Sequence, residues 1–80
     1  MNIEVKLFFN FSQYLPPGSK EGKVSLSIDE GLTIEGLMER LGISPELPRM
    51  IVLNGIIEQN SHRNLKEGDV VAVFPPLFGG

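Results

Sequence analysis

Apolar and polar residues alternate from Ile3 to Phe9, as they do in a β-strand with one face toward a core. One predicted face is entirely apolar and carries Ile3, Val5, Leu7 and Phe9. The other face carries Glu4, Lys6 and Phe8. The same alternation returns at residues 23–28, where one side carries Val24, Leu26 and Ile28. The sequence therefore predicts two strands, separated by a turn segment with two prolines and two glycines at residues 14–22.

The apolar spacing changes at residues 33–42, where it follows the period of a helix. The apolar stripe consists of Ile34, Leu37, Met38 and Leu41. Thr33 is a suitable N-cap, and Gly42 is a suitable stop at the C-terminal end. Gly36 in the helix interior costs about 1 kcal/mol relative to Ala. We therefore expect the packing of the stripe, more than intrinsic propensity, to hold this helix.

Three further strands are predicted in the second half of the chain. Residues 50–58 form two apolar runs around Asn54-Gly55, a dipeptide typical of tight hairpin turns. Leu65 lies in a polar loop and is expected to fill the core beneath it. The last strand covers residues 70–74 and turns Val71 and Val73 toward the helix. Its outer face is left with Val70, Ala72 and Phe74.

The predicted order of elements is strand, strand, helix, strand, short strand, strand, all within 80 residues. A sheet with a single helix across one face is an α+β architecture. The order fits the β-grasp arrangement of ubiquitin-like domains, a mixed sheet whose first and last strands lie parallel and side by side in the middle. We expect one β-grasp domain at residues 1–74 and an extended, flexible tail at residues 75–80.

The composition excludes several classes of function, because the residues or patterns that those functions need are absent. The net charge is −3 and the seven Lys and Arg residues are scattered, which argues against nucleic-acid binding. No apolar run approaches the roughly 20 residues of a membrane span, and the start MNIEVKLFF lacks a signal-peptide pattern. We therefore expect a cytoplasmic protein without a membrane partner. With no Cys, the chain has no disulfide, no thiolate metal ligand and no cysteine nucleophile.

Few side chains are placed for catalysis. His62 is the only histidine and lies in a polar loop, so no metal site is expected. Glu35 could pair with Glu30 or Glu39, but a solvated helix face explains these carboxylates better. No glycine-rich loop between a strand and a helix is available to hold a phosphate. We expect the folded domain to bind no cofactor and not to be an enzyme.

Two phenylalanines interrupt the polar face of the predicted sheet. Phe8 points to the side of Glu4 and Lys6, and Phe74 lies on the outer side of the last strand. If the first and last strands are neighbours, both rings lie on one exposed surface. Two adjacent exposed rings favour a surface for a protein partner over scattered single hydrophobes.

The tail consists of Pro75, Pro76, Leu77, Phe78, Gly79 and Gly80. The prolines cannot donate ladder hydrogen bonds, so the sheet is expected to end there and the chain to continue extended. Without a ladder partner, the residues after Pro76 are expected to be mobile in the isolated protein. The shape suits a narrow channel in another protein, because the glycines let the backbone approach reactive groups. A terminal carboxylate becomes a good acyl donor only after activation, for example as an acyl-adenylate.

The whole chain resembles the MoaD/ThiS family of ubiquitin-like sulfur carriers. The resemblance rests on VKLFFNF near the start, LNG at residues 53–55, LKEGDVVAVF and the end FPPLFGG. The Phe-Pro-Pro points to the molybdopterin branch, since thiamin carriers are usually shorter and lack the proline pair. The chain departs from the family pattern at Ser12 and Gln13, where Arg-Glu is common, and in the loop QNSHRN.

The resemblance implies a mechanism and partners. An adenylyltransferase related to ubiquitin-activating enzymes (MoeB/ThiF-like) would use ATP and Mg²⁺ to adenylate Gly80. A sulfur donor protein would then supply the sulfur of a C-terminal thiocarboxylate. The large subunit of molybdopterin synthase (MoaE-like) would receive the tail, with Gly79 keeping its path narrow and residues 75–78 positioning it. The family's exposed apolar positions fall on Phe8, Phe74 and Ile57, which would form the docking surface.

Three other functions remain open at this point. The chain could carry sulfur for thiamin or another product, or it could be a protein modifier joined to lysines through Gly80. These share the adenylation step with the molybdopterin carrier. A plain β-grasp interaction module, with an incidental Gly-Gly, fits the apolar tail poorly.

Overall fold

A computed structural model of the chain describes residues 1–76. The predicted mobility of the chain after Pro76 concerns residues outside this range. The elements follow the predicted order, with one addition, a 3-10 helix after the first strand. They are β1 (Asn2–Leu7), η1 (Phe9–Tyr14), β2 (Lys23–Ser27), α1 (Ile34–Leu41), β3 (Met50–Leu53), β4 (Ile56–Ile57) and β5 (Val70–Phe74).

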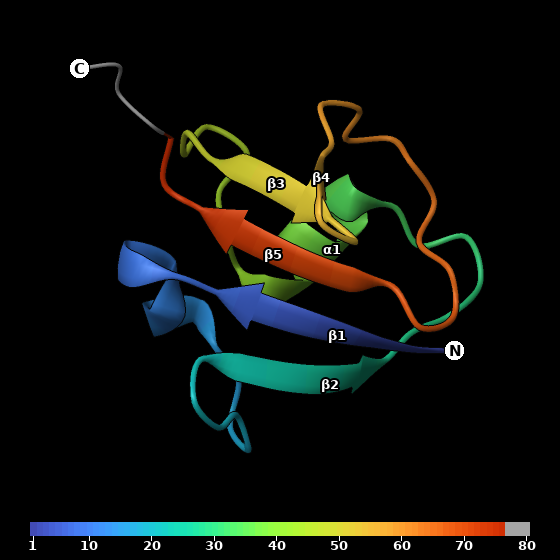
Figure 1. Ribbon diagram of the computed structural model, residues 1–80, viewed down its shortest axis with the longest axis horizontal. Helices are drawn as coiled ribbons and strands as arrows, with labels where there is room; N and C mark the ends of the chain where they lie inside the picture. Colours follow the sequence, from blue (N-terminus) through green and yellow to red (C-terminus); the bar gives the residue numbers. More distant parts are fainter. Residues whose placement is uncertain (77–80) are drawn as a thin grey trace.

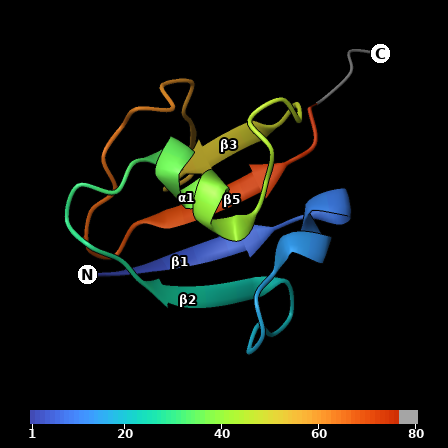
Figure 2. The same cartoon turned by 180° about the vertical axis from the view of Figure 1, so that it is seen from behind.

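The five strands form one mixed sheet in the order β2-β1-β5-β3-β4. The first and last strands, β1 and β5, are parallel neighbours in the middle, and Val5 is in register with Val71. All other pairs are antiparallel. The helix α1 lies across one face, so the molecule has two layers (Figure 1, Figure 2). The predicted α+β sheet with its parallel central pair is therefore confirmed.

The core lies between α1 and the central strands. Val5, Val71 and Val73 of the sheet and Leu37 of the helix are fully buried. Leu65 closes the core from the loop, as predicted, with 2% of its surface exposed. The other buried apolar side chains of this core are Ile3, Leu7, Phe11, Ile28, Ile34, Met38, Ile43, Ile51 and Leu53.

Both ends of α1 are capped as the sequence predicts. The Thr33 hydroxyl accepts a hydrogen bond from the Gly36 amide at 3.0 Å. Gly42 adopts a left-handed conformation with φ 82°, and its amide donates to the Glu39 carbonyl at 3.0 Å. The loop 61–65 wraps the helix start, because the amides of Ile34 and Glu35 donate to its carbonyls. This loop therefore fixes α1 against the sheet.

Leu37→Ala is expected to lower the free energy of unfolding by about 2–5 kcal/mol, a large share for a domain of this size. Leu37 is fully buried at the centre of the helix–sheet contact, so the shortened side chain leaves a cavity. Urea denaturation with matched m-values measures the difference. Glu39→Ala on the exposed side of the same helix is the control and should stay within about 0.5 kcal/mol of the wild type. Equal midpoints for Leu37→Ala and the wild type would refute this packing.

The prediction that Phe9 packs in the core is wrong. β1 ends at Leu7, and the chain turns into η1, where the Phe11 amide donates to the Phe8 carbonyl at 3.0 Å. Phe9 has φ 54° at this turn, and 76% of its surface is exposed. Phe11, two residues later, is fully buried. The alternating pattern continues to Phe9, but the strand it describes stops two residues earlier.

Candidate functional site

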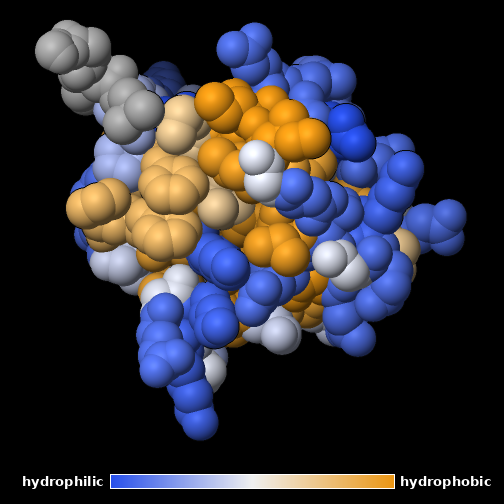
Figure 3. Space-filling model, in the orientation of Figure 1, coloured by the Kyte–Doolittle hydropathy of each residue, from blue (hydrophilic) through white to orange (hydrophobic). Residues whose placement is uncertain are grey.

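The sheet face opposite α1 carries a continuous apolar surface, here called the outer face. Cross-strand register places Ala72 of β5 opposite Val52 of β3, and Val52 opposite Ile57 of β4. A second row pairs Met50 with Phe74. Figure 3 looks onto this face and shows an apolar region over β3, β4 and β5, bordered by polar side chains. The outer face comprises Phe8, Met50, Val52, Ile57, Val70, Ala72 and Phe74.

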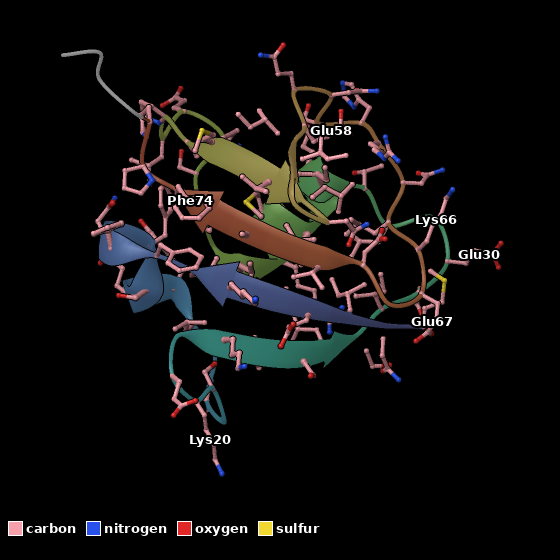
Figure 4. The ribbon with its side chains drawn as sticks, in the orientation of Figure 1. Lys20, Glu30, Glu58, Lys66, Glu67 and Phe74 are labelled. Carbon is pink, nitrogen blue, oxygen red and sulfur yellow. The ribbon has the colours of Figure 1, made fainter. Side chains whose placement is uncertain are left out.

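Phe8 and Phe74 are stacked at one end of the outer face. Their ring centroids lie 4.3 Å apart and the ring planes differ by 4°. The Phe8 amide donates to the Val73 carbonyl at 3.0 Å, which extends the β1–β5 contact past the end of β1. Both rings are half-buried. Figure 4 labels Phe74 on β5, close to the turn into η1. The structure thus brings together the two phenylalanines that the sequence placed on one surface.

Ile57 and Phe9 are the most exposed apolar side chains near this surface. Ile57 is 58% exposed and faces outward beside Val52, as predicted. Phe9 directly follows the stacked Phe8 and is 76% exposed. No signal in the sequence marks Phe9 as a surface residue, because the alternating pattern assigns it to the core. Ile56 is also exposed, but it is paired with the buried Leu53 and so belongs to the other face of the sheet.

The charged groups on the outer face lie at its β1–β2 side. Lys6 is in register with both Lys23 and Ala72. The Lys23 ammonium and a Glu4 carboxylate oxygen are 4.0 Å apart, with both side chains partly exposed. A pair this exposed contributes less than about 1 kcal/mol to stability. The outer face is therefore an apolar surface with a charged margin, suited to binding a protein.

The tail begins at the end of β5. Pro75 and Pro76 follow Phe74 and are half-buried. They leave the sheet beside the start of β3, because Phe74 is in register with Met50. The predicted roles of Leu77, Phe78, Gly79 and Gly80 fall outside the described residues and stay predictions.

Comparison with known proteins decides the family. The model of the ThiS family matches residues 8–80, which include the Phe8–Phe74 pair and the whole tail. The chain belongs to the ThiS family. No curated protein sequence is similar enough to count as a match.

Solved structures agree with this family and with the β-grasp fold. The proposed molybdopterin converting factor subunit 1 of Pyrococcus furiosus is similar with a TM-score of 0.73 and 26% identity, over 95% of this chain and 98% of that one. A complex of subunits 1 and 2 of the molybdopterin-converting factor of Helicobacter pylori contains a similar chain, with a TM-score of 0.65 and 26% identity over 100% of both chains. Small archaeal modifier protein 1 of Haloferax volcanii has a TM-score of 0.69 at 23% identity, covering 95% of this chain and 98% of that one, and supports the fold alone.

This ThiS-family chain is thus a small β-grasp member of a family of ubiquitin-like sulfur carriers, which are not themselves catalytic. Its carboxylates at Glu30, Glu35 and Glu39 are exposed, as is His62. Among residues 1–76, no three His, Cys, Asp or Glu side chains gather in a way that could hold a metal ion. The helices in the same range are all too short or too polar to cross a membrane.

Proposed function

We propose that the chain carries sulfur at Gly80 for the biosynthesis of molybdopterin, the ligand of molybdenum and tungsten cofactors. The observation that carries this proposal is the family match, which runs through FPPLFGG to Gly80. The Phe-Pro-Pro sequence and the similarity to two molybdopterin-converting-factor chains at 26% identity support the molybdopterin branch.

The chemistry follows from the carboxylate and from the absence of thiols. A carboxylate is a poor acyl donor, because an oxide leaving group is not displaced at neutral pH. An adenylyltransferase transfers AMP from ATP to the Gly80 carboxylate, with loss of pyrophosphate, and Mg²⁺ serves in that enzyme. Sulfur from a donor protein then takes the place of AMP. Since the chain has no Cys, this thiocarboxylate is the only sulfur on it that carries a negative charge at neutral pH.

The outer face is the surface through which partners hold the chain. Phe8, Phe74 and Ile57 form its anchors, and Phe9 extends it beside the stacked pair. The tail starts at the edge of this face, so a partner bound there also receives residues 75–80. The proposed partners are the adenylyltransferase and a large molybdopterin synthase subunit. The similar structure from Helicobacter pylori is a complex of subunits 1 and 2 of the molybdopterin-converting factor.

Reconstituted sulfur transfer tests the pathway. The thiocarboxylated chain is mixed with the large subunit of molybdopterin synthase and its pterin precursor, and the product is measured by fluorescence after oxidation. A parallel reaction uses thiazole synthase and its substrates. Product only in the first reaction supports the proposal. Product only in the second reaction assigns the chain to thiamin, and lysine conjugates in place of either product assign it to protein modification.

A further inference from the structure

A groove runs between α1 and the edge of the sheet formed by β3 and β4. Its volume is about 490 Å³. The apolar lining comes from Ile34 and Met38 of α1, Met50 and Ile51 of β3, Ile57 of β4, and Pro76. A smaller hollow of about 230 Å³ lies beside it and shares Glu35, Met38 and Arg49 with it. Both apolar and charged side chains line these two hollows, which do not include the stacked phenylalanines of the outer face.

Negative charge lines the helix side of this groove. Glu35 and Glu39 lie one turn apart on α1, are exposed, and form no ion pair within residues 1–76. Glu58, labelled beyond the end of β4 in Figure 4, is already paired with Arg63 at 2.9 Å. The Arg49 guanidinium is tied to the loop before β3, where it donates to the carbonyls of Ser44 and Leu47 at 2.8 and 3.0 Å. Arg49 lines both hollows and keeps its positive charge, so the negative side of the groove is the rim of α1, where Glu35 and Glu39 lie.

The opposite wall offers an open position of the strand ladder. The β3–β4 ladder covers two pairs, and the Glu58 amide adds a hydrogen bond to the Ile51 carbonyl at 2.9 Å. In an antiparallel strand, every second residue directs its backbone amide and carbonyl toward the same edge. The residue before Ile51 that faces this edge is therefore Arg49. The backbone amide and carbonyl of Arg49 make no hydrogen bond to any other part of residues 1–76.

We propose that this groove binds an extended segment of a partner protein, with apolar side chains on one side and Lys or Arg on the other. Side chains of an extended segment alternate between two faces, so the apolar ones contact the accessible Met50 and Ile57 while the basic ones face Glu35 and Glu39. The backbone of the segment pairs with Arg49. The outer face meets the groove at Ile57 and Met50, so one partner can cover both. Binding in the groove needs no chemistry at Gly80.

The test is an NMR titration with two synthetic peptides. One is acetyl-Lys-Val-Lys-Val-Lys-amide, and the other has Glu in place of every Lys. At low salt, the basic peptide is expected to give saturable shifts at Met38, Ile51 and Ile57, and the acidic peptide none. The double variant E35K/E39K should weaken binding by about tenfold or more, because surface pairs contribute up to about 1 kcal/mol each. The control E21K/E30K changes the net charge equally at exposed sites outside the groove and should keep the affinity within about twofold.

Several results would overturn the groove assignment. They are equal binding of both peptides, absence of saturable shifts in the groove, and shifts confined to the outer face. A chain that ends at Pro76 tests whether the chain's own tail occupies the groove. Pro76 lines the groove, and Leu77 and Phe78 follow it in the sequence. If the basic peptide binds only to this shortened chain, the groove holds the chain's own tail and the partner proposal is wrong.

Discussion

Removal of Gly80, or addition of one residue after it, is expected to abolish formation of the thiocarboxylate and all sulfur transfer that depends on it. The deletion places the carboxylate one residue short of the adenylating site, and the addition moves it one residue beyond. A residue spans about 3.3–3.6 Å of extended chain, while catalytic geometry tolerates displacements of about 1 Å or less. The rate of adenylation, followed by pyrophosphate release, measures the effect.

Stability provides the control for both Gly80 variants. The buried apolar core spans Ile3 to Val73, so a change at residue 80 leaves its packing intact. We expect melting temperatures within about 1 °C of the wild type, a shift that corresponds to much less than 1 kcal/mol. Trimming the lengthened variant back to Gly80 with a carboxypeptidase should restore activity. Full activity of the lengthened chain without trimming would contradict the carrier mechanism.

The double variant Phe8→Asp/Phe74→Asp is expected to bind the activating enzyme and the large synthase subunit at least about 100-fold more weakly than the wild type. Buried aromatic anchors often contribute 2 kcal/mol or more each, and tenfold in affinity corresponds to 1.4 kcal/mol. The two effects are coupled because the rings are stacked at 4.3 Å, so we expect less than their sum. Calorimetric titration against each partner measures the loss.

Weaker binding by this double variant has to be distinguished from unfolding of the domain. The rings are half-buried, so their removal is expected to lower the free energy of unfolding by about 1–2 kcal/mol while the domain stays folded. Ile56→Asp is the matched control, because Ile56 is 72% exposed but belongs to the other face of the sheet. Its affinity should match that of the wild type. An unchanged affinity of a folded Phe8 and Phe74 variant for both partners would show that the outer face is not the docking surface.

Most of the fold can be predicted from the local spacing of apolar residues along the chain. The stripe from Ile34 to Leu41 and the caps at Thr33 and Gly42 are local features, and each is found where the sequence placed it. The pairing of Phe8 with Phe74 followed from the parallel neighbours β1 and β5, which the order of elements indicated. These features depend on spacing within one element or on the connection between two.

The features that the sequence did not predict depend on where a strand ends and on contacts between distant segments. An alternating sequence does not reveal that β1 stops at Leu7, so the pattern places Phe9 on the core face although its side chain is exposed. A single 3-10 segment such as η1 is too short to show a period of its own. The groove is built from α1, the β3–β4 edge and Pro76, and no local pattern joins segments that far apart.

The mass of the intact protein after sulfuration tests the central claim most directly. The chain is incubated with its cognate activating enzyme, ATP, Mg²⁺ and a sulfur donor, and then fragmented to locate any change. The proposed function predicts a gain equal to the mass difference between sulfur and oxygen, confined to Gly80. An unchanged mass, with the enzyme shown to adenylate the chain, would contradict it. Attachment of the chain to lysines of other proteins with no detectable thiocarboxylate would contradict it equally.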